Sequence, residues 1–356
     1  MTVAAAAGTE EWVRRVLAAH WDGPWEGCAL RPLTVDGRRP LTHTAGLWEV
    51  SGPAGELVLK VQLTPEAVRA ERFVPLKRRV IEHCRRRGVP ALPLVPTADG
   101  RPGVRVDGLP CELSPRSAGA VATGAPGQVA ALVRTGLDLR AALDALPPGV
   151  ADALATVPLP RLVAEEHWPT ALAQAERRLL PAAARGTGPW YRAATGVLRE
   201  LAATAPLLRD AGAGPAGRPA VVHGDLHLAH FLLGPGRPAR VVAVLDFDNL
   251  HVADRLLDLA WLADTAVHAC GDDRDGARRA VADLVAEGRR RGLLQRGDEA
   301  RLMPLLLAHS LPVLVDIAKD IVERDLLAPQ WLDYFALLSP ARRAAVHELL
   351  VEAGGP

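Results

Sequence analysis

The chain has 356 residues and a formal net charge of +1, so it carries no excess of charge that would recruit nucleic acid or an anionic membrane. Hydrophobic residues make up 49% and charged residues 23% of the sequence, as expected for a globular protein with two domains or one bilobed unit. The four cysteines lie far apart without C-x-x-C spacing, and the first residues lack the pattern of a signal peptide. We therefore expect a cytoplasmic protein without disulfides, a zinc site or a membrane span.

The first 112 residues have the pattern of a small, strand-rich lobe. Residues 9–20 predict a short amphipathic helix, and residues 29–63 predict a β-meander whose apolar runs are separated by turn sequences. A helical stripe of apolar residues follows and ends at Gly88, after which short strands and turns return as far as Glu112. We expect residues 1–112 to form an N-terminal lobe of helix, meander and helix.

Residues 113–356 are helical in pattern, apart from a strand-like hairpin at 220–248. Amphipathic periodicity predicts helices over 127–145, 161–184, 188–209, 254–269, 275–292, 298–326 and 340–353. The predicted fold class is therefore α+β, with a small strand-rich lobe followed by a larger helical lobe that carries the hairpin.

Side chains that can carry chemistry gather in residues 221–264. One apolar, β-branched run leads into a His-Gly-Asp triplet at 223–225, and a second run ends at an Asp-Phe-Asp triplet at 246–248. Two strand ends therefore bring carboxylates to one place. A single aspartate after a strand often only caps a turn, but the paired arrangement favours a functional site.

Lysine is rare in this chain and occurs only at Lys60, Lys77 and Lys319, so 39 of the 42 basic residues are arginine (42 − 3). Arginine can replace lysine where only a positive charge is required, and a retained lysine therefore points to chemistry. Lys60 lies in an apolar strand of the meander, where a lysine either points to water or has a function. The basic runs at 77–79 and 85–87 predict a solvated helix face rather than an RNA-binding surface.

The order of the motifs resembles that of a known family. An HGD triplet, an LDFD motif whose first aspartate, Asp246, follows Asp225 by twenty-one residues, and DLA at 258–260 are similar to the catalytic core of the aminoglycoside phosphotransferase and choline kinase family. The resemblance covers the two-lobe layout, and its specific part is residues 221–262. It implies a bilobal protein-kinase-like fold.

The same resemblance implies an ATP-dependent phosphotransferase that moves the γ-phosphate to a hydroxyl of a small molecule. The acceptors it admits are antibiotics, other natural products and metabolites, together with a peptide serine or threonine. ATP or GTP and Mg²⁺ would be the cofactors. A nucleotide and the acceptor are the expected partners, with no nucleic acid and no membrane, while a protein partner stays open.

The resemblance also implies roles for residues of the motif. Asp225 would orient the acceptor hydroxyl and accept its proton as the catalytic base, and Asp246 would bind Mg²⁺ beside the nucleotide phosphates. His223 and Asp258 would support the loop backbone rather than react. For Asp248 two expectations remain open, a place near a second metal ion and a place facing solvent.

His230 departs from the family pattern, which usually has asparagine five residues after the catalytic aspartate. An amide oxygen suits Mg²⁺, whereas an imidazole suits softer metals. We retain His230 as a candidate metal ligand. Three outcomes remain open for this site: two metal ions, one metal ion, or a kinase homologue with impaired activity.

Lys60 matches the lysine with which the family grips the nucleotide phosphates. The resemblance also implies a carboxylate partner for this lysine on the following helix. Glu71 fits the Arg-Glu frame of the family best, and Glu66 and Glu82 remain open as alternatives.

Two further segments of the N-terminal lobe are expected to contact the nucleotide. The phosphate-covering loop is placed at residues 42–47, which contain the single glycine Gly46. Glu112 and Leu113 follow a strand and are expected to form the hinge that meets the base through backbone groups.

Two other functions are compatible with parts of the sequence. A metal-dependent hydrolase could use a cluster of ligands formed by His223, Asp225, His227 and His230. This function leaves Lys60 and residues 246–260 without a role and therefore ranks lower. A nucleotide-binding pseudokinase that acts through a protein partner has the unusual histidine at position 230 as its only direct support.

The acceptor pocket has one hint in the sequence. If the acceptor is cationic, acidic walls would favour its binding. The candidates that follow the Asp-Phe-Asp triplet are Asp264, Asp272, Asp273 and Asp275.

Overall fold

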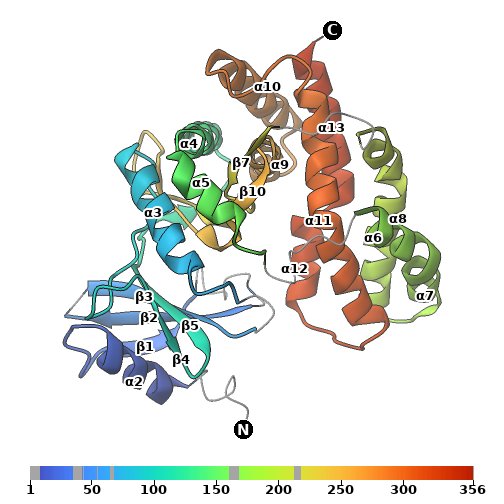
Figure 1. Cartoon of the computed structure of the whole chain (residues 1–356). Coiled ribbons are helices and arrows are strands. Elements are labelled where there is room, and N and C mark those ends of the chain that lie inside the picture. Colours follow the sequence, from blue (N-terminus) through green and yellow to red (C-terminus); the bar gives the residue numbers. More distant parts are fainter. Residues whose placement is uncertain are drawn as a thin grey trace.

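A computed structural model describes residues 9–34, 42, 44–53, 55–64, 68–159, 168–211 and 218–355. These residues form a strand-rich N-terminal lobe and a larger helical lobe (Figure 1). The predicted fold class, α+β with two lobes, is confirmed. Among the residues described, no helix combines the length and apolarity needed to cross a bilayer.

The N-terminal lobe is built on an antiparallel sheet whose strand order is β1-β2-β3-β5-β4. Its strands are β1 (Ala29–Pro32), β2 (Ala45–Gly52), β3 (Gly55–Gln62), β4 (Val104–Val106) and β5 (Leu109–Pro115). The first three strands pair in chain order, as the predicted meander requires. Helix α2 (Glu10–His20) covers the sheet, and the hydroxyl of its cap residue Thr9 accepts a hydrogen bond from the Trp12 amide at 3.3 Å.

The last strand of this sheet continues beyond the expected lobe boundary at residue 112. β5 pairs with β3 from Cys111 to Pro115, and Lys60 of β3 lies opposite Glu112 of β5. The chain therefore leaves the sheet after Pro115. The sequence did not reveal this continuation because a charged residue, Glu112, interrupts the apolar run of the strand.

Helix α3 (Phe73–Arg86) lies between the sheet and helices α4 and α5 (Figure 1). Its apolar side chains belong to the core of the larger lobe rather than to the core between α2 and the sheet. These side chains are Phe73, Leu76, Val80, Ile81 and Cys84. The helix is thereby held against the larger lobe, and one of its faces reaches the short helical turn η4 (Phe247–Asn249).

The larger lobe consists of helices around two small β-sheets. Its helices are α4 (Pro126–Asp144), α5 (Pro148–Ala155), α6 (Trp168–Gln174), α7 (Leu180–Arg185), α8 (Pro189–Ala211), α9 (Leu257–Cys270), α10 (Arg274–Arg290), α11 (Glu299–Val322), α12 (Gln330–Leu337) and α13 (Pro340–Gly354). The sheets contain β7 (Pro219–Val222) with β10 (His251–Asp254), and β6 (Ala120–Val121) with β8 (Phe231–Leu233) and β9 (Val241–Val244). The predicted hairpin is therefore divided, because β8 pairs with β9 while β7 pairs with β10.

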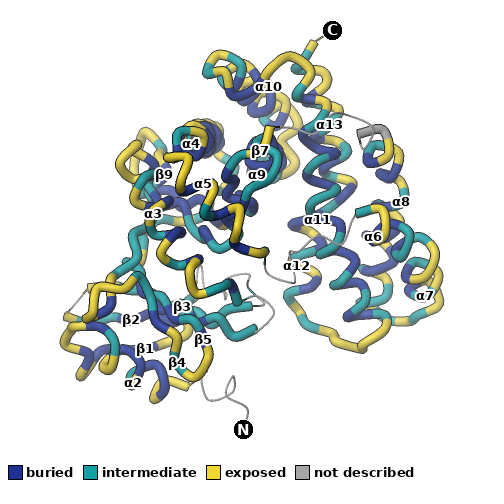
Figure 2. The backbone as a smooth tube through the Cα atoms, viewed as in Figure 1, coloured by how far each residue is buried: buried dark blue, intermediate teal, exposed yellow. Residues whose placement is uncertain are grey.

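Helix α9 occupies the centre of the larger lobe. Its residues from Leu257 to Ala266 are all buried, and it packs against α4, α10 and α11. Figure 2 shows how buried backbone gathers in the interior of this lobe, while exposed segments lie on its outer turns and loops. The first turn of α9 contacts the loop that follows β7, so a buried and rigid element supports that loop.

Candidate active site

A cavity of about 700 Å³ lies between the two lobes, which is within the usual range of small-molecule sites. Strands β3 and β5 contribute Lys60 and Glu112 to its walls, and the segments after β7 and β9 contribute Asp225 and Asp246. Side chains of α11 and α12 line it from the larger lobe. The fold thus brings together charged groups that are far apart in the sequence.

The loop after β7 is fixed by a buried ion pair. Asp258 accepts hydrogen bonds from the backbone amides of His223 and Gly224, each at 3.0 Å. Arg140 of α4 donates to the same carboxylate at 2.9 Å and to the carbonyl of Val221 at 2.8 Å. The side chains of Arg140 and Asp258 are 0% and 1% exposed. Water is therefore excluded from the contacts that set the backbone of this loop.

Gly224 and His223 complete this support. Gly224 has a φ of +80°, and a Cβ at this position would lie 2.8 Å from the carbonyl oxygen of Asn249, so only glycine fits here. Its own carbonyl accepts a hydrogen bond from the Trp261 indole at 3.1 Å. The buried His223 has a pKa lowered to about 4 by desolvation, and its Nε2 lies 3.0 Å from the carbonyl of Leu245. The neutral ring therefore connects the loop to the end of β9.

Asp225 lines the cavity, and its Oδ2 accepts a hydrogen bond from Nδ2 of Asn249 at 3.2 Å. Burial raises the pKa of Asp225 to about 6, although His230 and Asn249 act in the opposite direction. A carboxyl group with a pKa near the working pH is suited to accept a proton and release it again. Asn249 was not singled out in the sequence, although it directly follows the Asp-Phe-Asp triplet.

Asp246 adopts a left-handed backbone conformation with a φ of 56°, and its carboxylate accepts a hydrogen bond from the Asp248 amide at 3.3 Å. The Nζ of Lys60 lies 2.9 and 3.0 Å from the two carboxylate oxygens of Asp246, and 2.8 Å from Oδ2 of Asp248. Burial alone would lower the pKa of Lys60, but the two aspartates outweigh this effect and raise it above its ordinary value. The ammonium group is therefore charged and joins the two lobes.

The carboxylate partners of Lys60 differ from the expected ones. Glu71 is exposed, and no ion pair joins it to Lys60 among the described residues. Glu82 pairs with Arg78 at 2.7 Å on the surface of α3, and Glu66 lies outside the described residues. The prediction of a glutamate partner is therefore wrong for the first two candidates, because β3 directs the lysine to the aspartates that follow β9.

Lys77 belongs to the site, and the prediction that it lies on a solvated helix face is wrong. The predicted solvated face of α3 holds for Arg79, which is exposed, but the Lys77 side chain is only 4% exposed. Lys77 lies four residues after Phe73 and shares its helix face, a position that the neighbouring arginines concealed. Its Nζ contacts Oε2 of Glu112 and, at 2.6 Å, Oδ1 of Asp248.

Glu112 contributes a side chain to the site rather than a hinge. Burial raises the pKa of Glu112, although Lys77 acts in the opposite direction. Leu113 is fully buried inside β5, and its carbonyl accepts a hydrogen bond from the Val95 amide at 2.7 Å. The prediction of a base-binding hinge at these two residues is therefore wrong, because the sheet continues through them to Pro115.

The predicted phosphate-covering loop falls partly outside the described residues, which omit 35–41 and 43. Gly46 lies in β2, which begins at Ala45, and it is not among the described residues that line the cavity. Thr44, just before this strand, does line the cavity. Gly46 is therefore a strand residue rather than part of a loop.

Asp248 lines the cavity with a side chain that is 31% exposed, and both of its carboxylate oxygens contact lysines. Burial alone would raise the pKa of Asp248, but Lys60 and Lys77 hold it well below its ordinary value. Arg69, a further residue missed in the sequence, donates from Nη1 to the carbonyls of Asp248 at 3.0 Å and Leu250 at 3.2 Å. Three cations therefore hold the Asp-Phe-Asp segment: Lys60 of β3, Lys77 of α3, and Arg69, which precedes α3.

His230 provides a test of whether a cation fits the site. Its Nδ1 lies 2.7 Å from the carbonyl oxygen of Asp225, and this nitrogen carries the proton because a carbonyl only accepts. Nε2 of the same ring lies 3.9 Å from Oδ2 of Asp246, and without a proton this nitrogen is an acceptor that faces an acceptor. Two acceptors that face each other in this way fit a cation between them. The rings of His227 and His230 lie tilted against each other with centroids 3.6 Å apart, and both offer nitrogen atoms within 4.8 Å of an oxygen of Asp225.

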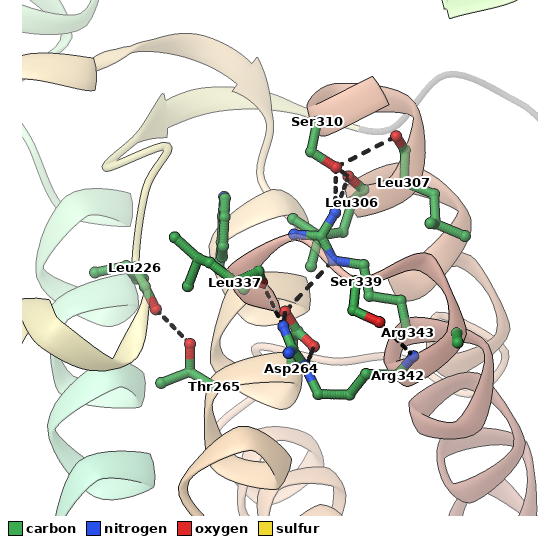
Figure 3. A network of polar contacts seen from close by, with 12 residues as sticks. Leu226, Asp264, Thr265, Leu306, Leu307, Ser310, Leu337, Ser339, Arg342 and Arg343 are labelled. Carbon is green, nitrogen blue, oxygen red and sulfur yellow. Dashed lines mark hydrogen bonds and ion pairs between the residues drawn. The ribbon is translucent and has the colours of Figure 1, made fainter. Parts of the chain in front are cut away.

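The acidic wall of the cavity differs from the expected one. Arg342 contacts the two carboxylate oxygens of Asp264 at 2.8 and 3.0 Å, and Arg343 contacts the same group at 3.4 Å (Figure 3). Because α9 is buried, Asp264 faces the arginines of α13 instead of the cavity. None of the four aspartates suggested by the sequence lines the cavity, whereas Asp316 and Asp320 of α11 do.

Comparisons with known proteins bear on the chain as a whole. The sequence model of the phosphotransferase enzyme family matches residues 43–305, which is well over half of the chain. A comparison with curated protein sequences found no match.

Several solved structures share the fold. A spectinomycin phosphotransferase matches with a TM-score of 0.63 and 9% identity, covering 95% of this chain and 98% of that chain. A microcompartment-associated aminopropanol kinase matches with a TM-score of 0.62 and 17% identity, over 97% and 99% of the two chains. An amicoumacin kinase matches with a TM-score of 0.61 and 13% identity, over 98% and 96%. These likenesses establish the fold, and the match to the family model confirms the resemblance seen in the motifs: the chain belongs to the phosphotransferase enzyme family.

Proposed function

We propose that this phosphotransferase moves the γ-phosphoryl group of ATP to a hydroxyl group of a small molecule, with Mg²⁺ as its cation. The observation that carries the proposal is the convergence of Lys60, Asp225 and Asp246 on one cavity between the lobes. Phosphoryl transfer needs a cationic side chain for the phosphates, a carboxylate for a divalent cation and a base for the acceptor. The N-terminal lobe would bind the nucleotide, and because the protein would use ATP we expect it to work in the cytoplasm.

Lys60 would bind the phosphates of the nucleotide. Its side chain is 23% exposed and lines the cavity, so phosphate oxygens can reach it and offer it anionic partners in place of the aspartates. Asp246 is then released from its ion pair, and its oxygens become available to Mg²⁺ together with Nε2 of His230. When bound, the cation would neutralise charge on the phosphates during transfer.

Asp225 would act as the catalytic base. The acceptor oxygen forms a bond to the γ-phosphorus while the bond from this phosphorus to the bridging oxygen of ADP breaks. The proton of the acceptor hydroxyl passes to the carboxylate of Asp225, which Asn249 orients through its hydrogen bond at 3.2 Å. The support of the loop by Asp258 keeps this base in place as the ligands exchange.

The acceptor would lie between Asp225 and helices α11 and α12. This part of the cavity is lined by Asp316 and Asp320 together with the aromatic side chains of Trp331 and Tyr334. Arg324, which also lines the cavity, pairs with Asp316 at 3.3 Å and with Asp320 at 2.5 Å. A compound that carries both a hydroxyl and an amine would compete with this guanidinium for the carboxylates and contact the aromatic side chains. The solved structures named for spectinomycin and aminopropanol share the fold, and the compounds in their names guide the choice of acceptors to test.

A screen for acceptor-dependent release of ADP tests the proposal. The purified protein is incubated with Mg²⁺ and ATP, and a panel of hydroxylated antibiotics, amino alcohols and other metabolites is added one compound at a time. We expect one or more compounds to raise ADP release in the parent protein and not in the Asp225→Asn variant. An equal response of parent and variant would remove Asp225 from the reaction. The proposed activity would be contradicted if no class of compound in the panel raised ADP release.

A further inference from the structure

Both carboxylate oxygens of Asp248 are held by lysines. Oδ1 lies 2.6 Å from Nζ of Lys77, and Oδ2 lies 2.8 Å from Nζ of Lys60. Asp246, two residues earlier, pairs with Lys60 but has no contact with Lys77 among the described residues. The two aspartates of the segment therefore share Lys60, and Asp248 alone has Lys77 as a second cation.

The two lysines differ in what they can reach. Lys60 lines the cavity, and its side chain is 23% exposed. Lys77 does not line the cavity, its side chain is 4% exposed, and Glu112 is its second carboxylate partner. A phosphate that enters the cavity can therefore draw Lys60 away from the aspartates, whereas Lys77 stays enclosed between Glu112 and Asp248.

We propose that Lys77 is a positioning residue that retains Asp248 when Lys60 turns to the nucleotide, so that Asp246 alone of the two aspartates binds the cation. The inference rests on the proposed function, because it assumes a nucleotide and a divalent cation in the cavity. In this arrangement the ammonium group of Lys77 occupies the position at which Asp248 would otherwise bind a second metal ion. The predicted set of metal ligands is thereby reduced to Asp246 and His230.

Electrostatics favours this division of roles. A second divalent cation on Asp248 would lie close to the Lys77 ammonium group, and like charges at such short distances repel strongly in a site with little water. The Lys77 ammonium group stays beside Asp248, since its side chain is 4% exposed between Glu112 and Asp248 and α3 is held against the larger lobe by its apolar residues. Removing its charge would therefore open Asp248 to a second cation.

Counting bound Mn²⁺ in the complex with AMP-PNP tests the inference. The parent protein and a Lys77→Met/Glu112→Gln double variant are titrated with Mn²⁺, and free Mn²⁺ is followed by electron paramagnetic resonance. The double variant removes one positive and one negative charge, so it leaves no unpaired buried glutamate and keeps the net charge. Thermal unfolding verifies that it folds, and Arg79→Met on the exposed face of α3 is the matched control.

We expect one Mn²⁺ per complex in the parent and in Arg79→Met, and two in the double variant. Adding Asp248→Asn to the double variant should restore a single Mn²⁺. Two Mn²⁺ in the parent complex, or one in the double variant, would overturn the inference while leaving the proposed function intact. A parent protein that does not bind AMP-PNP would overturn the proposed function and the inference with it.

Discussion

The loop after β7 and the Asp-Phe-Asp segment each bring an aspartate to the same cavity, but they are held in different ways. The loop depends on Asp258 and Arg140, whose side chains are 1% and 0% exposed, so no ligand can compete for them. The Asp-Phe-Asp segment depends on the pair of Lys60 with Asp246, whose side chains are 23% and 32% exposed and line the cavity. Ligands can reach the second set of contacts and not the first.

We propose that this difference separates a fixed base, Asp225, from an exchangeable cation site at Asp246. Breaking a buried ion pair leaves an uncompensated charge and costs about 3–5 kcal/mol. Asp225 therefore keeps its place, while the partly exposed Lys60 can exchange its carboxylate partners for phosphate oxygens, because these oxygens replace the negative charge that it gives up.

The largest effect is expected for Asp225→Asn, which removes the base and leaves the nucleotide contacts of Lys60 unchanged. We expect kcat to fall by about 10²–10⁴-fold, the usual contribution of a positioned base. Nucleotide binding should be retained, which isothermal titration with AMP-PNP would verify. A variant with the kcat of the parent would show that the fixed loop does not carry the base.

Breaking the buried support should affect folding rather than ligand exchange. Arg140→Met leaves the Asp258 carboxylate buried without its cation, and we expect the free energy of unfolding to fall by about 3–5 kcal/mol. Urea denaturation measures this change. Arg134→Met on the exposed face of the same helix is the matched control and should alter stability by no more than about 0.5 kcal/mol. Equal stability of the two variants would contradict the assigned role of the buried pair.

The sequence was informative where the site is local along the chain. Asp225, His230 and Asp246 lie within one segment bounded by strand-like runs, so their proximity could be predicted before any packing was known. Lys60 was recognisable because lysine is scarce and because apolar residues surround it in its strand. Strand periodicity and the chemistry of the side chains pointed to these residues, and the resemblance to the family implied their roles.

The sequence was less informative where the site depends on packing between distant elements. The position of Glu112 opposite Lys60 follows from the pairing of β3 with β5, which no local pattern encodes. Lys77 lies among arginines, and only the packing of α3 against the larger lobe decides which of these cations is buried. The acidic residues of the cavity wall, Asp316 and Asp320, likewise depend on how α11 is packed.

Removing the carboxylate of Asp246, the proposed ligand of the cation, should abolish the stabilisation of the folded protein by nucleotide. Asp246→Ala takes away the carboxylate that we assign to the cation, and Mg²⁺ with ATP should then no longer raise the melting temperature. In the parent, ligand at about 100 times its Kd stabilises the folded state by about 2.7 kcal/mol. Asp225→Asn should keep the shift and is the matched control. An undiminished shift in Asp246→Ala would place the cation elsewhere.

The smallest effect concerns pH and again separates the base from the cation site. Burial raises the pKa of Asp225 from 3.8 to about 6, so the folded protein binds the proton more tightly than the unfolded chain does. The stability contributed by this group is therefore full below about pH 4 and is lost as the pH rises through about 6. Asp225→Asn cannot ionise and should lack this component, so the parent should lose stability relative to the variant between about pH 4 and pH 7.

Catalysis should follow the opposite direction, because only the ionised carboxylate accepts a proton. We expect kcat to rise about tenfold per pH unit up to about pH 6 and then to level off. Urea denaturation of parent and Asp225→Asn across this range, with kcat of the parent measured in the same buffers, gives both curves. A parent that gains stability relative to the variant as the pH rises would show that Asp225 is held in its ionised form, and the buried loop would then stabilise the anion rather than poise it as a base.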